Sequence, residues 1–147
     1  MEASVHREPP ADPAATGTAG LFADHALLRQ LLDGISEAAE EVVARRLPAS
    51  PALISLMREL QVILGEHLVQ ENAVLHPLIT ASPRSALLAE NLRQMHTRES
   101  RLLAAVNRWL AREVDAQTLA RHAAAFSEAI KLGLAFEERA VFRELRS

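Results

Sequence analysis

Histidine and glutamate recur at helical spacing in this chain, and together they could bind metal ions. His67 and Glu71 are four residues apart, so on a helix both side chains would lie on one face. His96 and Glu99 are three residues apart and would share a face in the same way. In dinuclear sites of helical bundles, an imidazole is a terminal ligand of one metal ion and a carboxylate bridges two. The chain has no cysteine, so the side-chain ligands would be imidazole and carboxylate, which suit iron, manganese or zinc.

Four apolar stripes, with alternating steps of three and four residues, predict the helices that would position these residues. The first helix is expected over about residues 22–46. Ser50 followed by Pro51, and again Ser82 followed by Pro83, are typical of a helix start, and Asp115 is expected to cap the fourth helix. Predicted connections of roughly four to six residues force neighbouring helices to run antiparallel. We therefore expect an all-α, antiparallel up-down-up-down four-helix bundle.

Polar residues interrupt each of the four predicted stripes. His25 does so in the first and Glu137 in the fourth, whose stripe is Leu119, His122, Phe126, Ile130, Gly133, Glu137 and Ala140. At about 1.5 Å of rise per residue, these residues and the two pairs above fall within roughly 12 Å along the axis of an antiparallel bundle. A single histidine on an apolar face is commonly a structural residue, and His122 is expected to be one. Several buried carboxylates at one level need a partner, and a cation is the simplest one.

The composition limits the other classes of function. A chain of 147 residues is long enough for one core, and its net charge of −3 with mixed signs gives no basic stripe for nucleic acid. It contains neither a secretory apolar region nor a run of about 18 apolar residues, so no membrane contact and a cytoplasmic location are expected. Residues 1–20, rich in Pro, Ala, Gly and Thr, predict a disordered leader with an inert His6, and residues 21–147 the bundle. The abundance of Ala and Arg suggests a bacterial source.

The polar positions and their order resemble those of the hemerythrin-like, or HHE cation-binding, domains over about residues 21–146. The similar segments are "ADHALLRQLL", "HLVQENAVLHPLI", "QMHTRESRLL" and "FEERAVF". The resemblance implies a four-helix bundle around a non-haem di-iron centre. In that family a histidine comes from each helix, and bridging carboxylates come from the second and fourth helices.

Applied to this chain, the resemblance implies a specific set of iron ligands. His25 and His67 would be terminal ligands of one iron, and His96 a terminal ligand of the other. Glu71 and Glu137 would bridge them, with Glu138 a second candidate for the fourth-helix bridge. The position of the fourth-helix histidine is Gly133.

The glycine at position 133 leaves three hypotheses open. In the first, a second metal is kept, and Glu99 turns inward to compensate while water or a small molecule fills the remaining position. In the second, one metal remains, bound by His25, His67 and a carboxylate. In the third, the bundle binds no metal, and its carboxylates are protonated, hydrated or paired with an arginine such as Arg98.

We therefore expect a metal-binding domain, with iron the first choice, concerned with oxygen, iron or redox sensing or handling. Dioxygen or another small ligand would be its partner. The alternative is a metal-free bundle that binds a protein partner or has a regulatory role. No catalytic triad, phosphate loop or cofactor motif is present, so turnover is not implied and no catalytic residue is assigned. Trp109 and Leu110 could belong to the core or to a contact between two copies of the chain.

Overall fold

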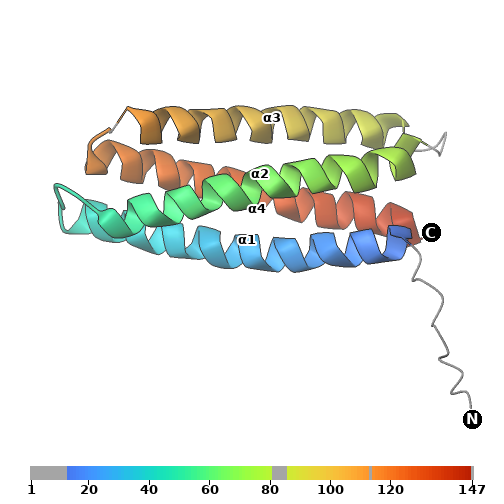
Figure 1. Cartoon of the computed structure of the whole chain (residues 1–147), viewed down its shortest axis with the longest axis horizontal. Helices are drawn as coiled ribbons and strands as arrows, with labels where there is room; N and C mark the ends of the chain where they lie inside the picture. The colour runs from blue at the N-terminus through green and yellow to red at the C-terminus, as the bar shows by residue number, and fades with distance from the viewer. Residues whose placement is uncertain (1–12, 81–85, 113, 147) are drawn as a thin grey trace, which may run out of the picture.

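The computed structural model describes residues 13–80, 86–112 and 114–146. These residues form four helices, α1 Pro13–Ala44, α2 Pro51–Thr80, α3 Ala86–Ala111 and α4 Ala116–Arg146, and no strand. Consecutive helices lie side by side and run in opposite directions, so that α1 begins and α4 ends at the same end of the bundle (Figure 1). Each of α1 and α3 packs against both α2 and α4, and the contact between α3 and α4 is the sparsest. The predicted up-down-up-down four-helix bundle is confirmed.

The first helix begins at Pro13, earlier than the sequence predicts. Proline is favoured in the first turn of a helix, and the alanines that follow it are the strongest helix formers. The prediction of a disordered leader is therefore wrong over residues 13–20, which are helical. Residues 1–12, with His6, lie outside the described part of the chain.

Two of the predicted helix caps are present. The Oγ atom of Ser50 accepts a hydrogen bond from the backbone N–H of Leu53 at 3.2 Å. Oδ1 of Asp115 accepts one from the N–H of Thr118 at 2.9 Å. These bonds satisfy backbone donors that the first turn of a helix leaves unpaired, so both caps are confirmed. Ser82 and Pro83 lie outside the described residues.

The end of α1 is closed by two backbone hydrogen bonds around Arg46. The N–H of Leu47 donates to the carbonyl of Val42 at 3.0 Å, and the N–H of Arg46 donates to that of Val43 at 3.3 Å. This is the Schellman pattern, in which the residue after the helix is left-handed and usually glycine. Arg46 takes that conformation, with φ of 50°.

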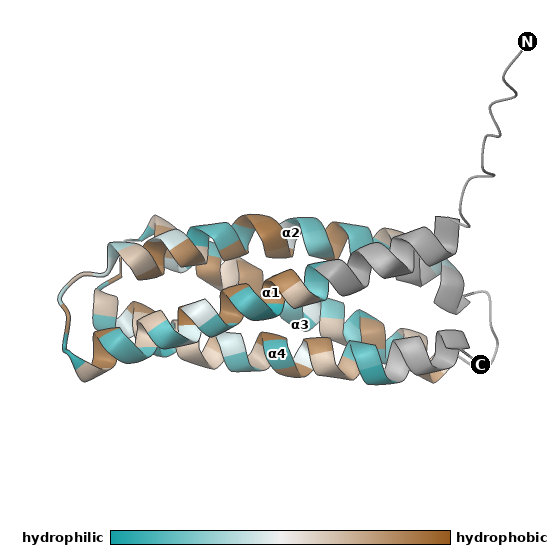
Figure 2. Cartoon of the chain, turned by 90° about the horizontal axis from the view of Figure 1, so that it is seen from below, coloured by the Kyte–Doolittle hydropathy of each residue, from teal (hydrophilic) through white to brown (hydrophobic). Residues whose placement is uncertain are grey.

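The core follows the predicted stripes, with apolar residues alternating with polar ones along each helix (Figure 2). Fully buried examples are Leu32, Leu60, Val106 and Ile130. In α4 the buried stripe passes through Ala123 and not through His122, which is exposed. The prediction that His122 belongs to the stripe is therefore wrong. The buried residue after Leu119 is four positions on, at Ala123, and not three positions on, at His122.

The only tryptophan of the chain belongs to the bundle's own packing. Trp109 stacks on the ring of His122, with centroids 4.4 Å apart and the ring planes 11° from parallel. Trp109 and Leu110 are both half-buried and pack against the core. None of the described helices is both long enough and apolar enough to cross a membrane.

Candidate metal centre

Ligand-type side chains from all four helices converge inside the bundle. Each lies on the inward stripe of its helix, where spacings of three and four residues keep side chains on one face. Five of them are buried and His96 is half-buried. The residues are His25 of α1, His67 and Glu71 of α2, His96 and Glu99 of α3, and Glu137 of α4.

The first group joins α1, α2 and α4. His25, His67 and Glu137 each offer one ligand atom, and these atoms lie within 4.8 Å of one another. Nε2 of His25 is 3.2 Å from Oε2 of Glu137. The rings of the two histidines meet edge to face, with centroids 4.9 Å apart.

The second group is rich in carboxylates. Glu71, Glu99 and Glu137 each offer one oxygen, again within 4.8 Å of one another. Nε2 of His96 lies 3.4 Å from Oε1 of Glu71. Glu137 belongs to both groups, and Glu71 contacts histidines on both sides, since its Oε2 is 3.0 Å from Nε2 of His67. Two carboxylates therefore stand between two clusters of possible ligands.

Most polar atoms of these groups are buried without a hydrogen bond to any described residue. They are both ring nitrogens of His67, both carboxylate oxygens of Glu71 and of Glu137, and Oε1 of Glu99. Although His67 and Glu71 approach to 3.0 Å, their angles do not make a hydrogen bond. Burying such groups without a partner is costly. The nitrogen and oxygen atoms converge as ligands do around a cation, and this donor set fits a first-row metal such as iron.

Burial and mutual contacts give the three carboxyl groups different pKa values. Burial raises the pKa of Glu137 to about 12, and the neighbouring Glu71 adds to the effect. Burial also raises the pKa of Glu99 to about 7, again helped by Glu71. For Glu71, burial acts in the same direction, but the contacts with His67 and His96 outweigh it and leave its pKa lowered. Without a metal, Glu71 is thus the carboxylate that keeps its charge, and a cation would displace protons from the others.

Glu138 faces the outer side of His25 and not the two groups. Its Oε1 lies 3.1 Å from Nδ1 of His25, which donates because an ionised carboxylate can only accept. Arg29 binds both oxygens of Glu138, at 2.5 and 2.6 Å. The hydrogen bonds from Arg29 lower the pKa of Glu138, and this effect is larger than the opposing effect of burial. The pairing directs Nε2 of His25 toward Glu137.

Two residues near the histidines were not found by sequence reasoning. Arg29 lies one turn after His25, and this i, i+4 spacing was the available signal. Oδ2 of Asp24 lies 3.7 Å from Nδ1 of His67. Asp24 is thus placed toward His67 as Glu138 is toward His25, but at a longer distance. Because Asp24 is on α1 and His67 on α2, nothing in the spacing of the sequence links them.

Gly133 lies directly against Glu99. A Cβ atom at position 133 would come within 2.7 Å of Oε1 of Glu99 and 3.7 Å of the methyl carbon of Met95. The space that a side chain of α4 would need therefore holds the carboxylate of Glu99. The inward turn of Glu99 is what the first of the three hypotheses requires.

Comparison with known families gives one match that covers most of the chain. The model of the hemerythrin HHE cation-binding domain matches residues 16–145. Comparisons with curated proteins and with solved structures give no significant match.

Proposed function

This chain belongs to the hemerythrin HHE cation-binding family, and we propose that its bundle holds a non-haem centre with two adjacent metal positions, iron being the first choice. Domains of this family bind metal ions, generally iron. One observation carries the proposal: buried nitrogen and oxygen atoms from α2, α3 and α4 have no hydrogen-bond partner among the described residues, and they face one another beside His25 of α1. A cation would satisfy them together.

In this proposal, His25 and His67 would be the terminal ligands of the first metal. Glu71 and Glu137, which lie between the two groups, would contribute ligands to both positions. The support for these roles is that Glu137 approaches His25, while Glu71 approaches both His67 and His96.

The second metal would be held by His96 and Glu99 together with the two bridging carboxylates. Glu99 takes the part of the missing fourth-helix histidine, and Gly133 provides the room for it. This second position is richer in carboxylate than the first, and carboxylate ligands are harder than imidazole. The ligand set is therefore unsymmetrical.

Glu138 and Arg29 would act as positioning residues. By accepting a hydrogen bond from Nδ1 of His25, Glu138 fixes the tautomer in which the lone pair of Nε2 can bind metal. Arg29 in turn holds Glu138 with two hydrogen bonds. Partners of this kind orient metal-binding histidines and raise their basicity.

The role that follows is oxygen, iron or redox sensing or handling. A bound iron pair would supply reversible electron transfer and binding of dioxygen. The protein holds the ligands at fixed positions, and its apolar residues keep bulk water from most of the set. A single metal on His25, His67 and Glu137 is the second candidate, because these three alone form a compact group.

The test is iron content after anaerobic loading with iron(II) and removal of excess metal. We expect about two iron ions per chain in the unmodified protein and about one in Glu99→Ala. Glu90→Ala is the matched control, since Glu90 lies exposed on the same helix and pairs with Arg93. About one iron in the unmodified protein, unchanged in Glu99→Ala, would support the single-metal candidate. No bound iron would contradict the metal function and leave the metal-free bundle.

A further inference from the structure

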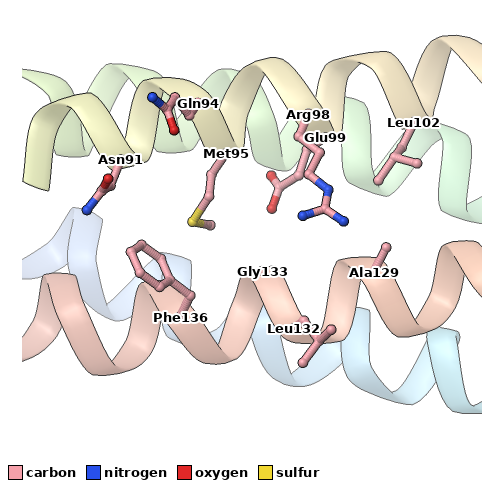
Figure 3. Close-up of a pocket in the computed structure, with 10 residues that line it drawn as sticks. All are labelled: Asn91, Gln94, Met95, Arg98, Glu99, Leu102, Ala129, Leu132, Gly133 and Phe136. Carbon is pink, nitrogen blue, oxygen red and sulfur yellow. The ribbon is translucent and has the colours of Figure 1, made fainter.

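A pocket of about 390 Å³ lies between α3 and α4, just outside the candidate centre. Met95 and Leu102 of α3 and Leu132 and Phe136 of α4 give it mainly apolar walls (Figure 3). A space of this size lies within the range of about 300–1,000 Å³ typical of small-molecule sites. Of the four pairs of neighbouring helices, α3 and α4 make the sparsest contact.

The inner wall of the pocket is formed by Glu99 and Gly133. Glu99 is only 4% exposed, and its Oε1 has no hydrogen-bond partner among the described residues. Because Gly133 has no side chain, the pocket wall at this point is the glycine backbone beside the carboxylate of Glu99. The pocket therefore lies directly against a residue of the candidate centre.

Arg98 supplies the only positive charge among the residues that line the pocket. It is exposed, and no hydrogen bond or ion pair joins it to another residue in the described ranges. Its guanidinium extends into the space between α3 and α4 beside Glu99 (Figure 3). A guanidinium presents paired N–H donors that match the two oxygens of a carboxylate.

From these features we propose that the pocket binds a small organic monocarboxylate with an apolar tail. The carboxylate pairs with Arg98, and the tail lies along Met95 and Phe136, past Gly133. The single cationic group sets the charge of the ligand, and the apolar walls set the character of its tail. The modest volume favours a molecule of this size over a folded partner.

The position of the pocket also predicts that ligand and metal affect each other, a step that rests on the proposed function. Glu99 would be a metal ligand on one side and the pocket wall on the other. A molecule that contacts this wall would change the affinity for the second metal, and the metal would change the affinity for the molecule by the same factor. Binding of the carboxylate itself does not require the metal.

The experiment titrates octanoate into the metal-free full-length protein with ¹³C-labelled methionine methyl groups. Met95 lines the pocket, whereas Met57 is buried in the core and serves as an internal control. We expect a saturable shift of the Met95 methyl signal and an unchanged Met57 signal. The absence of a saturable Met95 shift would overturn the proposal.

Variants test the role of the charge. Arg98→Ala should weaken octanoate binding by about tenfold, the scale of one charge-assisted contact, and leave binding of octan-1-ol unchanged. Arg101→Ala is the matched control, because Arg101 is exposed on the same helix but does not line this pocket. Equal octanoate affinity in the unmodified protein and Arg98→Ala, or an equal loss in Arg101→Ala, would sink the carboxylate assignment.

Iron uptake by the same protein preparations, measured after anaerobic loading with iron(II), separates this proposal from the metal function. Octanoate binding by a protein that takes up no iron would support the pocket and contradict the centre. In iron-loaded protein, a changed octanoate affinity would support the coupling of the two sites, and an unchanged one would contradict it.

Discussion

At the residue scale, Gly133 and Glu99 have to be understood together. Helical spacing in the sequence is enough to name Glu99 as a substitute for the missing histidine. It cannot decide whether the carboxylate turns inward, since that depends on the room that α4 leaves. In the structure, Oε1 of Glu99 lies where a Cβ of residue 133 would press on it, at 2.7 Å. The glycine thus makes room for the carboxylate of Glu99 from the neighbouring helix.

This relation predicts a non-additive pair of variants. Glu99→Ala alone should lose the second iron, and Gly133→His in that background should restore it, because the imidazole then has the space that Glu99 vacates. Gly133→His alone must displace the carboxylate end of Glu99. Iron content per chain is the measurement. A double variant that binds no more iron than Glu99→Ala would contradict the exchange.

Glu138 gives a second prediction at this scale. Glu138→Ala should lower iron affinity by about 10- to 100-fold while leaving the number of sites unchanged at saturating metal, because His25 loses its orienting partner. Competition with a coloured chelator measures the affinity. Arg45→Ala is the control, since Arg45 pairs with Glu41 on the exposed surface. A loss of one site, with the affinity of the other unchanged, would instead make Glu138 a ligand.

The raised pKa values of Glu99 and Glu137 predict proton release on metal binding. A metal requires the carboxylate forms. Glu99, with a pKa of about 7 in the metal-free protein, carries a proton below that pH and has lost it above. Glu137 keeps its proton on both sides of this range. The contribution of Glu99 to the proton release should therefore fall from about one proton to none as the pH rises through 7. It adds to that of His67 and His96, whose pKa values, despite burial, are raised by their contacts with Glu71, and affinity should rise with pH most steeply below about 7.

Calorimetry in two buffers that differ in ionisation enthalpy measures this proton release. Glu99→Gln is the comparison variant, because its amide cannot titrate, and its proton release should fall by about one proton less through pH 7 than that of the unmodified protein. An equal fall in the two proteins from pH 6 to pH 8, about one unit either side of the pKa of Glu99, would contradict the assignment of Glu99 as a ligand.

At the scale of the helices, the sequence predicts what depends on periodicity and misses what depends on space. The four stripes, the caps at Ser50 and Asp115 and the burial of the polar set all follow from spacing. The composition of residues 1–20, rich in Pro, Ala, Gly and Thr, does not reveal that α1 begins at Pro13. The sequence does not decide between His122 and Ala123 for the inward stripe, because the first is three residues after Leu119 and the second is four, and both spacings occur in a helical stripe.

The end of α1 allows a prediction about stability. Arg46 is left-handed, a conformation that costs free energy for any residue with a Cβ atom. Arg46→Gly should stabilise the fold by about 0.5–1 kcal/mol, the relief of strain being partly offset by a more flexible unfolded chain. Urea unfolding of the metal-free protein measures the change. Arg45→Gly, one residue earlier and not left-handed, should give no gain, and a gain of equal size there would contradict the explanation.

At the scale of the whole molecule, the candidate centre ties together four helices that are joined only by short connections. The topology could be predicted because such connections leave antiparallel neighbours as the only arrangement. The contacts of Glu138, Arg29 and Asp24, and the pocket between α3 and α4, could not be predicted. Each depends on the relative rotation of two helices, which the period of one helix does not determine.

A centre that joins all four helices should stabilise the whole bundle. Iron at about 100 times its dissociation constant would add about 2.7 kcal/mol to the free energy of unfolding if the unfolded chain does not bind it. The Tm should rise on anaerobic loading and return to its first value with a chelator. Glu99→Ala should show a smaller rise, and Glu90→Ala the full one. An iron-independent Tm would contradict a centre that links the helices.

The most direct measurement is anomalous diffraction at the iron edge from crystals of the iron-loaded protein. We predict two peaks inside the bundle, one beside His25 and His67 and one beside His96 and Glu99, with Glu71 and Glu137 contacting both. A single peak beside His25 and His67, with Glu99 away from it, would contradict the replacement of the missing histidine. No peak inside the bundle would contradict the metal centre as a whole.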